Sequence, residues 1–342
     1  MYSLGKVIYG NESTAQAALQ RFIEQPVDRE FLTANPAVSP FPKNKTTIAN
    51  PVSVSGPATF KRGDKSTLEF LPCEADGWWI DRADHREQFP FKVSVRNVWT
   101  TARNIVLRAG SPHNYLRMVE HIVALKRGMG IDNIIVETDS GDPPLFDRSS
   151  MDLVEALNEA GVEELPAPAP LVTVREPVTI AGVRGDFITL APAPRGETKL
   201  LMDVAVDFDS VLGQQRIQFE VTPKSFGHGA FARTNATRAQ MFYTKTVGKI
   251  FADTRNLGYT RENILIHGRK SYVNPPRFTE DAPGKSLEAV WHRATLDLLA
   301  ALSLIDTGRF VGSVWSYRAG HTLDCRLVTL LQLRDLLVPH VW

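Results

Sequence analysis

The order of apolar and polar positions divides the chain into two halves with the same layout. In each half, short alternating segments predict strands, and two segments with helical spacing flank one further strand. The strands predicted in the first half are Ser66–Pro72, Gly77–Asp81, Phe91–Val98, Asn104–Arg108 and Ile131–Thr138, and the helices are Tyr115–Gly128 and Ser150–Ala160. Gly128 and Gly130 are expected to end the first of these helices.

The second half repeats this order. Its predicted strands are Val178–Ile180, Phe187–Ala191, Leu200–Phe208, Gln215–Val221, Ile264–Ile266 and Val311–Ser316. Its predicted helices are Thr222–Ala232, a strongly amphipathic Leu287–Leu304 and His321–His340, with a longer segment over Gln240–Asn256. Strands followed by helices in both halves predict an α+β fold with a duplicated architecture.

Prolines set the expected domain boundaries. The run 162–177 contains four prolines, and we assign 166–177 as the linker between a first domain at 46–165 and a second domain at 178–342. Residues 1–45 are predicted to be an N-terminal extension, with one short helix in Ser13–Glu24 followed by a loop that crosses the surface. The length of 342 residues agrees with two domains, because one core rarely serves more than about 250–300 residues.

Composition narrows the class of protein without identifying its chemistry. Lys and Arg number 39 against 38 Asp and Glu, so the net charge of +1 argues against a nucleic-acid partner. We find no apolar run long enough for a transmembrane segment and no secretory signal at the N-terminus. Cys73 and Cys325 lack CxxC spacing and are expected to be reduced, buried thiols. A soluble, cytoplasmic protein is therefore expected.

Two histidines and a group of carboxylates lie in patterns that could carry catalysis. Glu120-His121 could pair a general base with a metal ligand, or could be a solvated pair on a helix face. His321 follows Gly320 and could donate a proton, or could cap or pack a helix end. Carboxylates between Asp132 and Asp147 could mark a site or could close turns.

The pair His292 and Asp297 has an unusual spacing. Five steps along an α-helix separate two side chains by roughly 140°, whereas four steps would leave about 40°. A π-bulge between them would bring both to one face, and without it they share no ligand. The chain contains no GxxxxGK[ST], GxGxxG, GxSxG or HExxH motif, which disfavours the usual phosphate-binding loops and serine-hydrolase chemistry.

In chain order these segments resemble one enzyme family. The segments that carry the resemblance are VEHIVALKRGMGIDN at 119–133, ETDSGDPPLFDRS at 137–149, AFART at 230–234, NPPRF at 274–278, the His292 helix and GHTL at 320–323. They resemble the UDP-3-O-acyl-N-acetylglucosamine deacetylases, which are zinc amidases of lipid A synthesis. The resemblance covers about Val52 to Leu337 and implies two similar α+β domains, each a sheet packed on a helical layer, with the active site at the cleft between them.

The resemblance also implies a role for each site residue. It makes Glu120 the general base, His321 the acid that protonates the leaving amine, and Thr234 a holder of the oxyanion. It makes His121, His292 and Asp297 the ligands of a Zn²⁺ cofactor. Any UDP diphosphate would have to be bound by a few local groups such as Arg293 and Arg261, because the chain has no basic surface.

Several departures from the family pattern leave alternatives open. Aligning back from Asp297 would put Arg293, which cannot bind a metal, in place of the ligand histidine; aligning forward from Glu288 restores His292 at the cost of one inserted residue. Ala301 stands at the position where the family pattern has a carboxylate that orients the acid histidine. The main hypothesis is therefore a metal-dependent deacetylase, the alternative is an impaired homologue that binds a lipid or nucleotide sugar in the same cleft, and an unrelated α+β protein is a third. The oligomeric state stays open.

Overall fold

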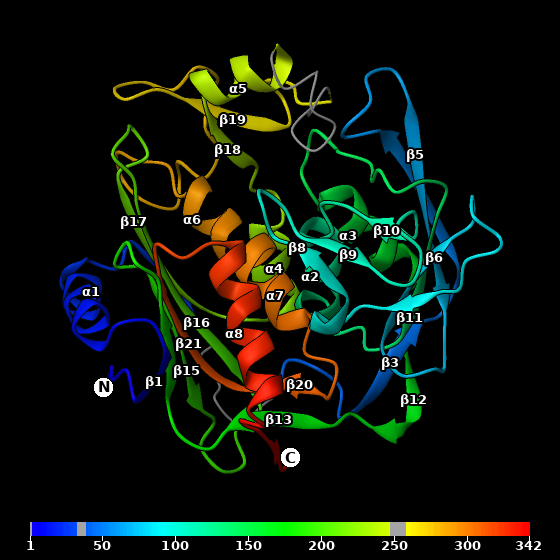
Figure 1. Ribbon diagram of the computed structural model, residues 1–342, viewed down its shortest axis with the longest axis horizontal. Coiled ribbons are helices and arrows are strands. Elements are labelled where there is room, and N and C mark those ends of the chain that lie inside the picture. Colours follow the sequence, from blue (N-terminus) through cyan, green and yellow to red (C-terminus); the bar gives the residue numbers. More distant parts are fainter. Residues whose placement is uncertain (1, 33–38, 247–257) are drawn as a thin grey trace.

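Two sheets enclose a central layer of helices. The computed structural model describes residues 2–32, 39–246 and 258–342. Figure 1 shows a larger sheet on the left, a smaller sheet on the right and most of the helices between them. One helix, α1, lies apart on the outer face of the larger sheet. Each sheet therefore turns one face to the shared helical layer.

The two sheets have the same topology. The smaller sheet has the order β4-β5-β11-β6-β7, and the larger contains β14-β15-β21-β16-β17. In each, the fifth strand in sequence lies between the second, to which it is antiparallel, and the third, to which it is parallel. The bounds are β4 (Val52–Pro57), β5 (Lys65–Pro72), β6 (Trp78–Arg82), β7 (Phe91–Lys92), β11 (Ile134–Thr138), β14 (Val178–Ala181), β15 (Phe187–Pro192), β16 (Leu200–Asp207), β17 (Gln214–Glu220) and β21 (Gly312–Tyr317). The expected duplication is confirmed.

In each half a helix precedes this fifth strand and another follows it. The helices are α2 (Glu120–Gly128) and α3 (Met151–Ala160) in the first half, and α6 (Glu288–His292), a π-helical turn (Arg293–Leu298), α7 (Leu299–Ser303) and α8 (His321–Leu333) in the second. Helices α2 and α7 pack against each other. One hydrophobic core consequently runs from Phe70 of the smaller sheet through Val123 and Leu299 to Met202 of the larger sheet.

Smaller elements surround this core. They are β3 (Asn44–Ile48), a 3-10 turn (Val95–Asn97), β8 (Val98–Thr100), β9 (Val106–Arg108), β10 (Tyr115–Leu116), β12 (Val162–Pro168), β13 (Leu171–Val174), α4 (Pro223–Gly229), β18 (Thr234–Thr237), α5 (Arg238–Lys245), β19 (Ile264–His267), β20 (Arg309–Phe310) and β22 (Leu337–His340). Strand β18 pairs in parallel with β19 and, with α5, lies at the top of Figure 1. Among the described residues, no helix has the length and apolar content needed to cross a bilayer.

The N-terminal extension is part of the larger sheet. Its expected helix is confirmed as α1 (Glu12–Glu24), but the segments on either side are strands rather than loop. Strand β1 (Lys6–Tyr9) pairs in parallel with β14 at one edge, and β2 (Arg29–Phe31) pairs in parallel with β17 at the other. The extension therefore covers both edges of a five-stranded unit and makes it seven-stranded.

A buried ion pair fixes the extension in place. Arg216 of β17 holds both carboxylate oxygens of Asp203 at 2.8 Å and donates at 2.7 Å to the carbonyls of Phe22 and Gln25 at the end of α1. On the opposite side, Phe22 packs against the ring of Phe187 in the sheet. These contacts pair the buried guanidinium with a carboxylate and supply donors to the carbonyl groups at the C-terminal end of α1.

Most of the segment assigned as the linker, 166–177, is β-strand. Strand β12 pairs antiparallel with β3, and the buried strand β13 lies between β20 and β22. The prolines are accommodated because β12 is exposed and has a register irregularity between Glu164 and Pro168. The numerical domain boundaries remain predictions.

Local backbone effects overturn three further expectations. The single strand at Phe91–Val98 is broken because Ser94 accepts a hydrogen bond from Arg96 N and starts a 3-10 turn. The helix expected from Tyr115 begins only at Glu120, after Met118 with φ +50°. The helix expected to reach His340 ends at Leu333, before Asp335 with φ +50°, and the chain continues as β22.

Burial differs from expectation in two places. The helical segment at 287–304 is not amphipathic, because it lies in the central layer and is buried at every position except Asp297. Both cysteines are free, but Cys73 follows β5 in a partly exposed turn, so its predicted burial is wrong. Of the segment Gln240–Asn256, residues 240–245 belong to α5 and 247–256 lie outside the described residues.

We predict that Phe22→Ala destabilises the whole protein. Phe22 is fully buried between α1 and the sheet, so its truncation should lower the free energy of unfolding by about 3–5 kcal/mol in urea titrations. The neighbouring Ile23 is 43% exposed, and Ile23→Ala serves as the control, with a much smaller loss. Equal losses for the two variants would show that α1 is not packed as described.

Candidate active site

The first turn of α2 supplies the two residues from the first half. Glu120 is buried, and its Oε2 accepts a hydrogen bond of 2.9 Å from Ile105 N. His121 is next, and its Nδ1 lies 3.4 Å from the hydroxyl of Ser150 at the start of α3. A carboxylate in a first helical turn faces unpaired backbone N–H groups and is favoured there. Both side chains are therefore held by neighbouring elements.

The π-helical turn brings together the two residues that the five-residue spacing would separate. It covers Arg293–Leu298, where a π-bulge would have to lie to bring His292 and Asp297 to one face. His292 Nδ1 consequently lies 3.4 Å from Asp297 Oδ1. Within the turn, the Thr295 hydroxyl donates to the carbonyl of Trp291 at 2.6 Å. The structure thus agrees with the alignment that contains one inserted residue.

Side chains from both halves converge around Thr234 at the start of β18. The Thr234 hydroxyl lies 2.9 Å from Nε2 of His292 and 3.4 Å from Nε2 of His121. On the other side, Nε2 of His321, the first residue of α8, lies 3.7 Å from Asp297 Oδ1 and 3.8 Å from Glu120 Oε1. All six residues expected to be catalytic or metal-binding therefore form one cluster.

Burial and neighbouring charges shift the pKa values in this cluster. Burial raises the pKa of the Glu120 carboxyl, although His321 acts against it. Burial, reinforced by His292, lowers the pKa of His121 to about 3, so this imidazole is neutral. Burial alone would lower the pKa of His321, but Asp297 and Glu120 outweigh it and raise that pKa. The cluster thus combines a poorly solvated carboxyl, a neutral imidazole and a readily protonated imidazole.

The donor types in the cluster fit a zinc ion. Two imidazoles and one carboxylate form a common ligand set for catalytic zinc. Asp297 Oδ1 is buried between Nδ1 of His292 and Nε2 of His321, but among the described residues it makes no hydrogen bond of good geometry, which leaves it available as a ligand. In the described part of the chain, however, no three His, Cys, Asp or Glu side chains already stand in a metal-binding arrangement. Both Nε2 atoms instead face the Thr234 hydroxyl.

His321 lacks the partner that would fix its ring. Its Nδ1 is buried and has no hydrogen-bond partner among the described residues. This missing partner is expected from the sequence, because the resemblance implies an orienting carboxylate at the position of Ala301. A neutral imidazole without such a partner has neither a fixed orientation nor a preferred tautomer.

A cavity of about 750 Å³ opens from the cluster. His292, Asp297 and His321 lie on its wall. Five arginines also line it, namely Arg103, Arg184, Arg293, Arg318 and Arg326, against three aspartates, Asp186, Asp207 and Asp297. Tyr9 of the N-terminal extension completes the wall and lies under the guanidinium of Arg326, 4.5 Å from its ring centroid. The excess of arginine favours an anionic ligand.

Most of these lining residues could not be identified from the sequence. Arg103, Arg184, Arg318 and Arg326 stand alone in the sequence, so no local motif marks them. Tyr9 lies in a segment without a counterpart in the resemblance. Only the fold brings these residues to one cavity.

The two arginines expected to bind substrate differ in their surroundings. Arg293 lines the cavity but is buried, and its Nη1 and Nη2 lie 2.8 Å and 2.5 Å from the carboxylate of Asp324 in α8. Arg261 is exposed and lines a separate hollow with Met241 and Ile266. The structure does not bring Arg261 to the cluster.

Among the carboxylates between Asp132 and Asp147, Asp132 has a structural contact. It forms an ion pair of 2.5 Å with Arg309.

Comparisons with known proteins point to one family. The family model described as UDP-3-O-acyl N-acetylglycosamine deacetylase matches residues 45–332. The UDP-3-O-acyl-N-acetylglucosamine deacetylase of Campylobacter concisus is 31% identical over 277 residues, which are 79% of this chain and 87% of that protein. The proteins of the same name from Campylobacter jejuni and Brucella melitensis are each 28% identical, over 279 and 293 residues that cover 80% and 83% of this chain and 86% and 94% of theirs.

We predict that Arg293→Met destabilises the fold. Removing the guanidinium leaves the carboxylate of Asp324 buried without its partner, which should cost about 3–5 kcal/mol in the free energy of unfolding. The matched variant Arg261→Met removes an exposed side chain and should leave stability nearly unchanged. Urea unfolding of both variants is the measurement. A stable Arg293→Met protein would contradict the structural role assigned to this ion pair.

Proposed function

The chain belongs to the UDP-3-O-acyl-N-acetylglucosamine deacetylase family, and we propose that it hydrolyses the acetamide of a UDP-3-O-acyl-N-acetylglucosamine on the route to lipid A. The observation that carries the proposal is the cluster around Thr234, in which acid, base and metal-binding side chains from both halves meet. A cluster of this composition suits hydrolysis of an amide bond.

His121, His292 and Asp297 would hold the zinc ion. His121 supports this role because it is neutral and can offer a nitrogen lone pair. Asp297 supports it because its Oδ1 is buried and lacks a hydrogen-bond partner in the described part of the chain. When bound, zinc would polarise the amide carbonyl and make water more acidic.

Glu120 would act as the general base. Its burial raises its pKa, so the carboxylate takes up a proton more readily than a solvated one. It would accept a proton from the water that attacks the acetyl carbonyl. Thr234 would donate its hydroxyl hydrogen bond to the oxygen that becomes negatively charged.

His321 would act as the general acid. It lies opposite Glu120, with its Nε2 between the carboxylates of Glu120 and Asp297, and these charges favour its protonated form. It would give this proton to the amide nitrogen as the C–N bond breaks. The products would be acetate and a free amine, with the water's oxygen in the acetate.

The arginine-lined cavity supports a nucleoside diphosphate as part of the substrate. Arg184, Arg318 and Arg326 are exposed at its wall, where they could pair with phosphate oxygens. This assignment replaces the expected pair Arg293 and Arg261 with residues that face the cavity and have free surface. The active site would then lie between the two halves of the molecule.

A second candidate function is ligand binding without turnover. The observation that favours it is the unpartnered Nδ1 of His321, together with Ala301 in place of an orienting carboxylate. Such a protein would bind an acylated or nucleotide sugar in the same cavity. A cytoplasmic location is proposed for either function and is supported by the free thiols of Cys73 and Cys325.

We predict that Glu120→Gln abolishes turnover but leaves zinc bound, whereas His121→Ala loses both. Release of acetate from UDP-3-O-acyl-N-acetylglucosamine should fall by about 10²–10⁴-fold in Glu120→Gln, because only the base is removed. Metal analysis of protein purified without chelator should find about one zinc ion per chain in the parent and in Glu120→Gln.

The control is His113→Ala, which removes an exposed histidine outside the cavity and should change neither property. A parent protein that contains zinc and binds the substrate but releases no acetate would favour the second candidate. A parent without zinc and without activity would overturn the proposed deacetylase.

A further inference from the structure

A second pocket lies where the two halves meet, away from the cavity described above. It has a volume of about 130 Å³, roughly ten times the 10–15 Å³ that one water needs. Its wall combines Lys45 of β3, Lys92 of β7, Lys126 and Arg127 of α2, and Arg309 of β20. It shares no lining residue with the active-site cavity. Along α2, Arg127 lies about 10 Å from Glu120.

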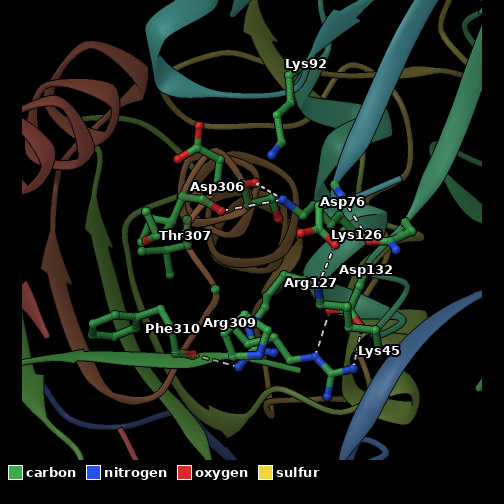
Figure 2. A pocket seen from close by; sticks show the side chains of 17 residues that line it. Lys45, Asp76, Lys92, Lys126, Arg127, Asp132, Asp306, Thr307, Arg309 and Phe310 are labelled. Atoms are coloured by element: carbon green, nitrogen blue, oxygen red, sulfur yellow. Dashed lines mark hydrogen bonds and ion pairs between the residues drawn. The ribbon is translucent and has the colours of Figure 1, made fainter. Parts of the chain in front are cut away.

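Positive charge exceeds negative charge in this pocket. Five cationic side chains face three aspartates, Asp76, Asp132 and Asp306. Two of the cations are paired, since Lys45 contacts Asp76 and Arg309 contacts Asp132, both at 2.5 Å. Lys92, Lys126 and Arg127 have no carboxylate within 4.0 Å among the described residues. Figure 2 shows the amino groups of Lys92 and Lys126 turned toward one another.

Arg127 is the least compensated of these cations. Its side chain is 6% exposed, and only Nη2 has a partner, the carbonyl of Phe310 at 2.6 Å. Its Nε and Nη1 are buried without a hydrogen-bond partner in the described part of the chain. One face of the guanidinium lies 5.3 Å from the ring centroid of Phe41. A buried guanidinium normally pairs two of its N–H groups with an oxyanion, and residues 2–32, 39–246 and 258–342 supply none here.

The fold explains only part of this arrangement. Lys126 donates to the carbonyls of Ser303 and Ile305, at 3.1 Å and 3.5 Å, and so satisfies the end of α7. Burial nevertheless lowers the pKa of Lys126 to about 8 and that of Arg127 to about 9, which shows that both charges are held at a cost. Helix-end contacts give no reason for the unpartnered N–H groups of Arg127 or for the presence of Lys92 in the same pocket.

We propose that this pocket is a second ligand site, which binds a phosphate group between Lys92, Lys126 and Arg127. A phosphate offers two negative charges, so its oxygens can accept from the two ammonium groups at once while its charge offsets that of the Arg127 guanidinium in the same pocket. The group could come from free phosphate or from a small phosphomonoester. The site is independent of the deacetylase proposal, because none of its residues belongs to the catalytic cluster.

The test is isothermal titration calorimetry of the full chain with inorganic phosphate and, separately, with glycerol 3-phosphate, at constant ionic strength. We expect saturable one-to-one binding of at least one of them, and the tighter ligand identifies the source of the phosphate group. Arg127→Met and Lys92→Met should each weaken this binding at least about tenfold. Lys92 is only partly buried and its ring contact is with Trp79, so Lys92→Met decides the question if Arg127→Met does not fold.

The matched control is Lys224→Met, which removes an exposed lysine outside the pocket and should bind like the parent. Chloride at the same ionic strength should give no saturable heat. Absence of saturable binding with both phosphates would overturn the proposal. Binding that Lys92→Met leaves unchanged would also overturn it, because the phosphate would then lie elsewhere.

Discussion

The candidate site depends on one π-helical turn in the centre of the molecule. An α-helix would point His292 and Asp297 in directions roughly 140° apart, and the turn at Arg293–Leu298 brings their side chains to 3.4 Å. The same turn leaves Arg293 directed at Asp324, which ties the segment to α8 and so to His321. One additional residue in a buried helix therefore sets the positions of His292 and Asp297 relative to His321 of α8.

The duplicated topology explains why this turn meets α2. Each sheet presents helices before and after its fifth strand on the inner face, so the helical layers of the two halves become one. Glu120 and His121 start the first-half helix, and His292 and Asp297 belong to its counterpart in the second half. The charged cluster is consequently buried at the joint between two similar units, where water is scarce and pKa values shift.

The sequence predicts features that local pattern determines. Alternating segments predict most of the strands of both sheets, and the five-residue spacing of His292 and Asp297 suggests a π-bulge as one of two alternatives, which the structure then shows. What it could not give depends on partners distant in the chain. Strand β1 forms by pairing with β14, which is more than 160 residues away in the chain. Strand β12 forms in spite of its prolines because it pairs with β3. Tyr9 and Arg326, more than 300 positions apart, meet only in the folded chain.

The central claim is that the π-helical turn brings His292 and Asp297 to one metal ion. Zinc K-edge X-ray absorption of the purified protein tests it most directly, because the spectrum reports the number and type of the zinc ligands. The account predicts a four-coordinate zinc ion with two imidazole nitrogens and oxygen ligands at about 2.0–2.2 Å. It also predicts that His292→Ala removes one imidazole from this shell. A zinc ion with no imidazole ligand, or a spectrum that His292→Ala does not alter, would contradict it.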